Sequence, residues 1–242
     1  GLPYPNSQFE TYVDEKGRQK QRLVSRDMWL GPDRFVIPGE VVGSNPTWPE
    51  YHPRHYQRLG GSLPNFYPPG PSEGVIDGMV AMVDVHFTCS MEPSYAATWG
   101  KGYRSNEEGI EKVRVAYQRE ATLLPKHPGL VTLSKREDLG MWELLLDFQT
   151  GGKGGRSWEA SYWPIDRELK GPDGPVSSIK CDRRHDPEEK RYSGIGWICS
   201  SGMRLTEHAS VRVDVYVSHL THMPSVFDQV QQLLVNVKQP RE

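Results

Sequence analysis

Lys153 stands among four glycines, and glycines beside a lysine are the residues that cradle phosphate in nucleotide-binding loops. Such a loop needs two glycines five positions apart, followed directly by Lys and then Ser or Thr at the start of a helix. That spacing is not met here, and the flanking residues 141–149 and 158–163 have the apolar patterns of strands. The segment 150–157 is therefore predicted to be a hairpin turn.

Two histidine pairs have the three-residue spacing that can place two zinc ligands on one face of a helix, namely His52 with His55 and His219 with His222. Pro53 interrupts the first pair and Pro224 closely follows the second, so neither pair is predicted to lie on a helix. Neither has a third ligand at a matching spacing. We expect no metal site and no cofactor, and we interpret these histidines as loop and strand-end residues.

Other catalytic patterns give no better candidate. The sequence has no Gly-x-Ser-x-Gly elbow, no cysteine with a nearby activating histidine, and no matched pair of carboxylates. The sequence therefore supports none of these reaction classes. The alternative is an envelope hydrolase or a small-molecule-binding protein, which a deep pocket joining His86, His55 or Glu143 with a shifted pKa would favour.

The chain has three cysteines, and Cys181 and Cys199 enclose a polar loop. A disulfide bond between them would close this loop and stabilise the fold by about 3 kcal/mol. Cys89 lies in a predicted strand and is interpreted as a buried free thiol. Other pairings, and three reduced thiols, remain alternatives. A disulfide would indicate an oxidising compartment, most simply the bacterial periplasm or the outside of the cell.

The composition of the 242 residues, 36% hydrophobic and 25% charged, is that of a globular protein. The net charge is −2 and the two signs are mixed along the chain, which argues against a nucleic-acid partner. No apolar run approaches the roughly 20 residues that span a bilayer. A chain that begins at Gly1 leads us to expect that a leader has been removed.

Periodic patterns predict the main elements. Alternation predicts strands, and the clearest is 211–220, where Val211, Val213, Val215 and Val217 share one face. Apolar residues recur every three or four positions over 106–124 and 224–237, which predicts two helices. Further strands are predicted at 34–38, 79–89, 141–149, 158–163, 179–182 and 195–200. These elements predict one α+β domain over 1–242, with mainly antiparallel sheets and helices packed on one face.

Two segments have no regular pattern. Residues 1–30 are predicted to be an extended, irregular arm with one short strand at most, and residues 43–71 a long loop rich in Pro, Gly and aromatic residues. The aromatic part of this loop, from Trp48 to Tyr67, and the charged loop between Cys181 and Cys199 are the candidate partner-binding segments. Their candidate contact residues are Trp48, Tyr51, His52, Arg54, Tyr56, Asp186, Glu188 and Glu189. The alternatives are a proline-braced cover over one sheet edge for the first segment and a solvated run of charges for the second.

The C-terminal region resembles a known family. The pattern consists of Cys181, a charged loop, Cys199, an alternating strand ending in His219-Leu220, then Pro224 and a closing helix. The upstream segment from Trp29 to Pro38 shares the resemblance. Both segments resemble periplasmic immunity proteins that protect bacteria from type VI secreted phospholipase effectors, especially those of the phospholipase D type. The matched segments cover about a third of the chain.

The resemblance implies a non-enzymatic protein that binds its cognate phospholipase in the periplasm and occludes the active site. Many such proteins carry a lipid anchor on an N-terminal cysteine, which would lie upstream of Gly1. The acidic residues Asp186, Glu188 and Glu189 could then oppose an electropositive phosphate-binding pocket. A structural lipoprotein of the secretion apparatus is a third hypothesis, and it would bind several partners instead of one.

Overall fold

The computed structural model describes residues 6–43, 56–63, 65–67, 75–76, 79–80, 82–89, 107–123, 130–150, 155–172, 174–175, 178–183 and 198–240. The chain divides into two compact units. The first comprises Gly1–Ser94, Met203–Val213 and Ser225–Glu242, and the second comprises Tyr95–Gly202 and Asp214–Pro224. Strands β14 (Ile198–Arg204) and β15 (Ala209–Tyr216) contribute to both units. That the chain folds as one domain stays a prediction.

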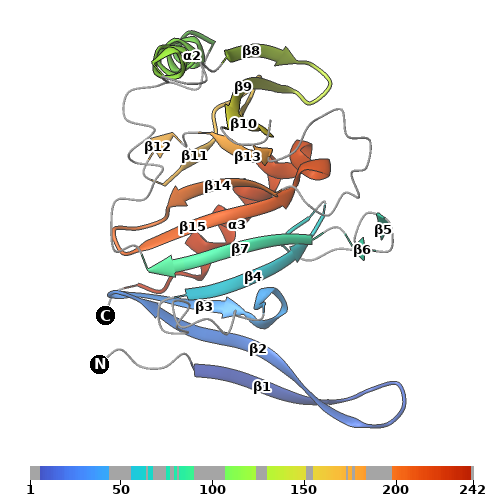
Figure 1. Cartoon of the computed structure of the whole chain (residues 1–242). Helices are drawn as coiled ribbons and strands as arrows, with labels where there is room; N and C mark the ends of the chain where they lie inside the picture. The colour runs from blue at the N-terminus through green and yellow to red at the C-terminus, as the bar shows by residue number, and fades with distance from the viewer. Residues whose placement is uncertain are drawn as a thin grey trace. The chain divides into compact units, whose positions relative to one another are not determined.

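The first unit begins with a three-stranded antiparallel sheet, in the order β1 (Asn6–Val13), β2 (Gln19–Leu30) and β3 (Asp33–Pro38) (Figure 1). A short 3-10 helix, Gly39–Val41, follows β3. The predicted strand at 34–38 is confirmed. The N-terminal residues, however, form a long hairpin and not an irregular arm with one short strand. Polar side chains occupy both faces of the outer half of this hairpin, so its sequence lacks the alternation of apolar and polar residues that predicts a strand.

The turn of this hairpin is built by Asp14. Its Oδ1 accepts hydrogen bonds from the backbone N–H groups of Lys16 and Arg18, both at 2.9 Å. Gly17 has a φ of 74°, a left-handed conformation that glycine adopts without steric cost. A short polar turn that contains glycine and joins two strand-forming segments is typical of a hairpin. The sequence therefore does contain local evidence for this element.

The other strands of the first unit follow the order β4 (Tyr56–Ser62), β7 (Met82–Cys89) and β15, with β4 and β7 antiparallel. Two short strands, β5 (Val75–Ile76) and β6 (Met79–Val80), pair with each other. The prediction of an irregular loop over 43–71 is therefore wrong at β4. A Cβ atom at Gly61 would lie 2.1 Å from the Phe66 ring, so close packing requires this strand glycine.

Helix α3 (Met223–Val237) confirms the predicted C-terminal helix. Its apolar stripe is buried and consists of Val226, Phe227, Val230, Leu233 and Leu234. Strand β15 is shorter than predicted, because the chain leaves the extended conformation at Tyr216 and forms a 3-10 helix, Val217–His222. The extended pattern ends there because the chain must turn into α3, whose second residue is Pro224.

Three segments of the first unit meet at the buried side chain of Asp33. Lys238 Nζ lies 3.2 Å from Asp33 Oδ1, and Thr206 Oγ1 donates a hydrogen bond of 2.6 Å to Asp33 Oδ2. The next residue along the chain, Gln239, donates its backbone N–H to the Arg34 carbonyl oxygen at 2.8 Å. The end of α3 is thereby held against β3, and the buried carboxylate is paired as burial of a charge requires.

The second unit contains the strand order β14, β13 (Ile179–Arg183), β10 (Gly155–Pro164), β9 (Met141–Thr150) and β8 (Leu130–Arg136). The β9–β10 register confirms the predicted hairpin. Helix α2 (Glu107–Thr122) packs against β8, and a core of Ile110, Val131, Leu144 and Trp163 joins them. Two short strands, β11 (Lys170–Gly171) and β12 (Gly174–Pro175), complete the unit. The predicted fold class, α+β with mainly antiparallel strands, is confirmed.

Candidate partner-binding surfaces

Most of the predicted contact residues lie outside the described residues. These are Trp48, Tyr51, His52, Arg54, Asp186, Glu188 and Glu189. Tyr56 begins β4, where its backbone pairs with Thr88, and its side chain is also outside the described part. Their role in partner binding therefore stays a prediction.

The disulfide bond between Cys181 and Cys199 confirms the predicted pairing. The two cysteines are direct partners on the antiparallel strands β13 and β14, with 4.1 Å between their Cα atoms. Both side chains are buried, which protects the bond from solvent. The bond joins the two strands that bound the charged loop, and it indicates an oxidising, extracytoplasmic compartment.

His219 and His222 both lie in the 3-10 helix before α3, with ring centroids 6.3 Å apart, so the expectation that this pair lies outside any helix is wrong. Burial and the neighbouring His222 lower the pKa of His219 from its ordinary value. Among the described residues, no group of three or more His, Cys, Asp or Glu side chains could hold a metal ion. His52 and His55 fall outside the described residues.

Glu143 was one of the residues that a hydrolase site would use. It is buried on β9, where it accepts a hydrogen bond of 2.6 Å from the Tyr162 hydroxyl. Arg136 Nη1 lies 3.1 Å from the same oxygen, and Arg136 also binds Asp138, which raises its pKa. These contacts hold the Glu143 carboxylate in place beside Tyr162 and Arg136. His86 lies on β7 with its side chain outside the described part, and His55 is not described.

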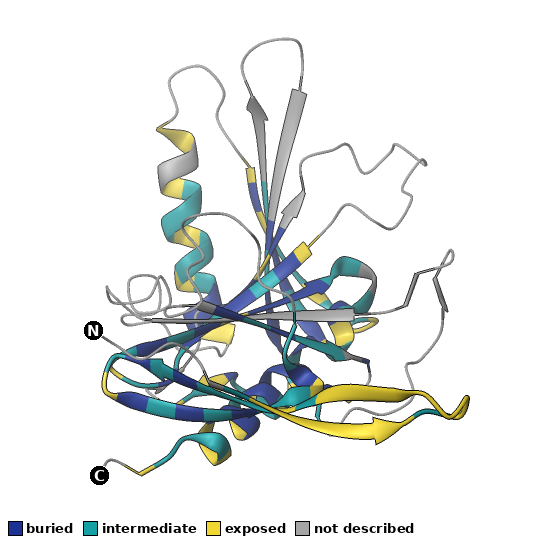
Figure 2. Ribbon diagram, turned by 90° about the horizontal axis from the view of Figure 1, so that it is seen from below, coloured by how far each residue is buried: buried dark blue, intermediate teal, exposed yellow. Residues whose placement is uncertain are grey.

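The largest group of exposed apolar side chains in the described part of the chain lies on the β1–β2 hairpin. Phe9, Tyr12, Val13 and Val24 are four of nine such residues, and Phe9 and Val13 are 60% and 62% exposed. Figure 2 shows the outer half of the hairpin exposed to solvent along both strands. We call the strand residues on either side of the turn, 9–13 and 19–23, the hairpin tip.

The two faces of the hairpin tip differ in charge. The register pairs Phe9 with Leu23, Thr11 with Gln21, and Val13 with Gln19, so one face is uncharged. On the opposite face Glu10 forms an ion pair with Arg22, and the Arg22 guanidinium lies 5.8 Å from the Tyr12 ring centroid. The charged face is therefore paired internally, whereas the uncharged face leaves apolar groups available to a partner.

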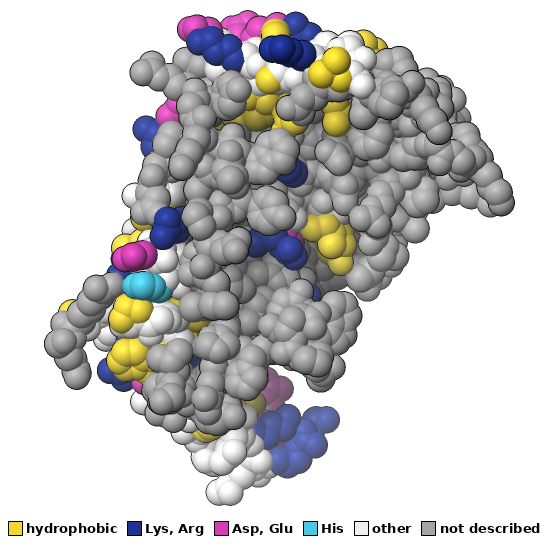
Figure 3. All heavy atoms as spheres, turned by 60° about the vertical axis from the view of Figure 1, so that its left-hand side comes forward, with side chains coloured by type: hydrophobic (Ala, Val, Ile, Leu, Met, Phe, Trp, Pro, Cys, Tyr) yellow, Lys and Arg dark blue, Asp and Glu magenta, His cyan; other side chains and the backbone are white. Residues whose placement is uncertain are grey.

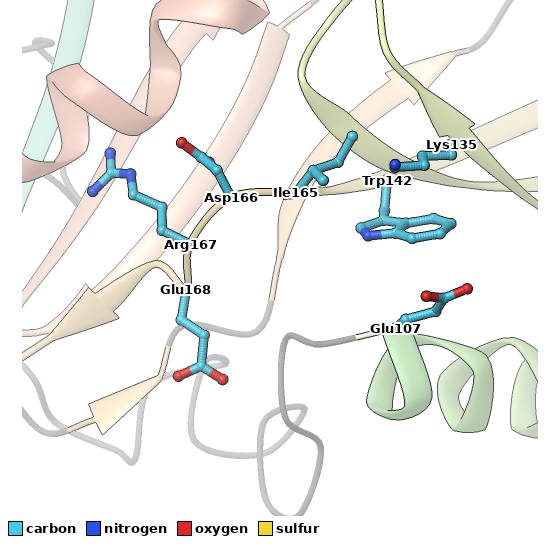
Figure 4. A pocket seen from close by; sticks show the side chains of 7 residues that line it. All are labelled: Glu107, Lys135, Trp142, Ile165, Asp166, Arg167 and Glu168. Carbon is cyan, nitrogen blue, oxygen red and sulfur yellow. The ribbon is translucent and has the colours of Figure 1, made fainter.

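A pocket of about 340 Å³ lies in the second unit (Figure 4). We call it the Trp142 pocket, and its lining residues are Glu107, Lys135, Trp142, Ile165, Asp166, Arg167 and Glu168. Glu107 begins α2, Lys135 and Trp142 lie on β8 and β9, and the other four follow β10 directly. The three walls of the pocket are distant in sequence and only the fold brings them together, so no local sequence pattern predicts the pocket.

Within the described residues, no helix is long and apolar enough to cross a membrane. No protein-family model matches the sequence, and no curated protein sequence matches it. Among solved structures, the fold matches an immunity protein of the Stenotrophomonas maltophilia type IV secretion system with a TM-score of 0.52. The two sequences are 15% identical, and the match covers 96% of this chain and 99% of that chain. The fold therefore resembles that of a bacterial secretion-system immunity protein.

Proposed function

We propose that this chain is a periplasmic immunity protein that binds a secreted phospholipase effector and inhibits it by occluding its active site. The observation that carries the proposal is the fold likeness to an immunity protein over nearly the full length of both chains. The disulfide bond supports a periplasmic location. The sequence resemblance adds the finer features, namely a type VI secretion system, a phospholipase D type of effector and a lipid anchor upstream of Gly1.

Three surfaces contribute to the proposed interface. The first two contain the residues expected from the sequence: Trp48, Tyr51, His52, Arg54 and Tyr56 on one segment, and Asp186, Glu188 and Glu189 on the other. The third is the uncharged face of the hairpin tip, where Phe9 and Val13 are exposed. A tight complex needs an interface above roughly 1,000 Å², and apolar anchors among polar residues are its usual centre.

The test begins with purified chain as bait in a periplasmic extract, followed by an assay of the captured protein on phosphatidylcholine vesicles. We expect the captured protein to release free choline, the product of phospholipase D, and added chain to suppress this release at a one-to-one ratio. Bait boiled in reductant serves as the control. Capture of no lipid-cleaving enzyme would contradict the proposed function.

The chemical identity of the released product distinguishes a phospholipase D effector from other phospholipases. Release of fatty acid in place of choline would overturn the phospholipase D type and retain a phospholipase partner. Deleting the secretion genes of the attacking strain tests the delivery system. If the chain is needed for protection only against a strain with an intact type VI system, the type VI assignment is supported. If it is needed only against a strain with an intact type IV system, that assignment is overturned.

A further inference from the structure

The Trp142 pocket combines an aromatic ring with carboxylates, a combination that selects for cations. We propose that this pocket binds an arginine side chain of the partner protein, with the guanidinium between the Trp142 ring and Glu107. The inference rests on the proposed function, because the arginine is assigned to the inhibited effector. Its first experiment uses a small probe and does not depend on the effector.

The Trp142 ring has one neighbouring cation already. Lys135 Nζ lies 6.0 Å from the centroid of the ring and 2.7 Å from Glu137 Oε1. In Figure 4 Lys135 and Glu107 lie on opposite sides of Trp142. The side of the ring toward Glu107 therefore combines an indole face with a carboxylate, both of which attract a cation.

The charges that line the pocket favour a cation over an anion. Three carboxylates, Glu107, Asp166 and Glu168, face two basic residues. Lys135 is paired with Glu137, and Glu168 is paired with Lys170 at 3.6 Å, and neither of these two partners lines the pocket. The Arg167 side chain points away from Trp142 in Figure 4. An anionic ligand would meet the carboxylates at close range, and like charges repel.

The size of the pocket limits the ligand to a small group. A volume of about 340 Å³ is at the low end of the range for ligand pockets, which runs from roughly 300 to 1,000 Å³. One long side chain suits this space better than a large cofactor. Guanidinium is favoured over ammonium because it is planar, stacks on an indole ring and can donate two parallel hydrogen bonds to a carboxylate. Trp and Arg are also the residue types that dominate binding energy at interfaces.

The first test uses N-acetyl-arginine amide as the probe and N-acetyl-citrulline amide as its uncharged isostere. The Trp142 indole N–H is followed by two-dimensional ¹H–¹⁵N NMR and assigned with the Trp142→Phe variant. We expect the arginine probe to shift this signal with a Kd on the order of 1 mM, and the citrulline probe to leave it unchanged. Equal shifts from both probes would overturn the inference, and equal binding of N-acetyl-lysine amide would overturn the choice of guanidinium.

Two matched substitutions on α2 test whether the Glu107 carboxylate contributes to binding of the arginine probe. Glu107 lines the pocket, whereas Glu111, on the same helix, pairs with Arg114 at 2.6 Å and does not. Figure 3 shows side chains of both charges gathered over this helix, so charge alone does not distinguish the two positions. We expect Glu107→Gln to weaken the arginine probe several-fold and Glu111→Gln to leave its Kd unchanged. Identical effects of the two variants would contradict the inference.

The second test uses the effector captured by the wild-type chain. We expect Glu107→Arg to weaken its inhibition at least about tenfold, and Glu111→Arg to change it by less than about twofold. If the wild-type chain captures no effector, the proposed function fails while the probe result stands. If it captures one and Glu107→Arg inhibits as well as the wild type, the assignment of the pocket to the partner fails alone.

Discussion

Two hairpins in the described part of the chain, β9–β10 and β1–β2, are built from strands of similar length but lie in different surroundings. The β9–β10 hairpin pairs with β8 on one side and β13 on the other, and its Ala160, Tyr162 and Trp163 are buried. The β1–β2 hairpin has β1 at the edge of its sheet, and its tip is exposed on both faces. The first hairpin therefore depends on packing, whereas in the second only the inner half of β2, with Met28 and Leu30, is buried and the outer half depends on its turn and its ion pairs.

The two hairpins differ in whether their side chains are buried in the fold or exposed on the surface proposed to bind a partner. We call the β9–β10 hairpin the central hairpin. Its buried carboxylate, Glu143, has its polar partners inside the fold, namely Tyr162 and Arg136. On the hairpin tip, Phe9 and Val13 are exposed instead of packed in a core. Changes to the central hairpin should reduce the free energy of unfolding, whereas changes to the tip should affect binding and leave the fold intact.

Tyr162→Ala should have the largest effect on stability. The side chain is fully buried, and its loss leaves a cavity and removes the hydroxyl bound to Glu143. We expect the free energy of unfolding to fall by about 3 to 5 kcal/mol, measured by urea denaturation followed by circular dichroism. Tyr162→Phe, which keeps the ring, should cost about 1 kcal/mol. Equal losses from the two variants would show that the ring is not packed as described.

Removing the disulfide bond next to the central hairpin should have the second largest effect. The bond joins cysteines 18 positions apart: Cys181 lies on β13, the neighbour of β10, and Cys199 lies on β14, the next strand in the sheet. The double variant Cys181→Ala with Cys199→Ala should lose about 3 kcal/mol, because its unfolded chain regains the entropy of an open loop. Reductant should destabilise the wild type to the same extent and leave the variant unchanged. A wild type insensitive to reductant after full unfolding and refolding would contradict this account.

Acid should open the turn of the exposed hairpin. Hydrogen bonds from the backbone and side chain of Arg18 lower the pKa of Asp14 below its ordinary value of 3.8. A carboxylate with a lowered pKa in the folded state stabilises it above the unfolded pKa, and this contribution is lost as the pH falls through the folded pKa. The amide signals of Lys16 and Arg18 should shift together in an NMR titration below pH 4. Asp14→Asn should abolish that shared transition; its persistence would assign it to another group.

Substitutions on the uncharged face of the tip should have the smallest effect on stability. Phe9→Ser with Val13→Ser should change the free energy of unfolding by no more than about 0.5 kcal/mol, because both side chains are already exposed. The same variant should bind the captured effector at least about tenfold more weakly, measured by calorimetry. Thr11→Ser, at the same face, is the conservative control. Unchanged affinity in the double variant would remove the hairpin tip from the proposed interface.

Elements with one buried face could be predicted, and elements without one could not. The period of two in β15 and the stripe of α3 correspond to burial of Val211, Val213, Val226 and Val230. The β1–β2 hairpin has no buried face at its tip, so periodicity carries no signal there and the turn at Gly17 was the remaining evidence. Strand β4 was missed because two glycines interrupt its pattern, and one of them is required by the close approach of Phe66.

The candidate sites were less predictable than the fold. Local sequence identified aromatic and charged segments as binding candidates, and these lie mostly outside the described residues. The Trp142 pocket joins the start of α2, two strands and the residues after β10, and no local pattern connects those segments. The hairpin tip could have been found from its turn, but the sorting of its side chains into a charged and an uncharged face depends on the strand register.

By itself, the sequence determined the α+β class and the C-terminal helix, and it favoured a pairing of Cys181 with Cys199 over alternatives that only the structure removed. Each depends on chain-local chemistry: a repeat that buries one face, or two thiols at the ends of a short loop. Only the tertiary structure decided that Thr206 reaches Asp33 across 173 positions and that Trp142 faces Glu107. Such contacts form because burial and strand pairing bring distant segments together, and periodic patterns in the sequence do not specify which segments meet.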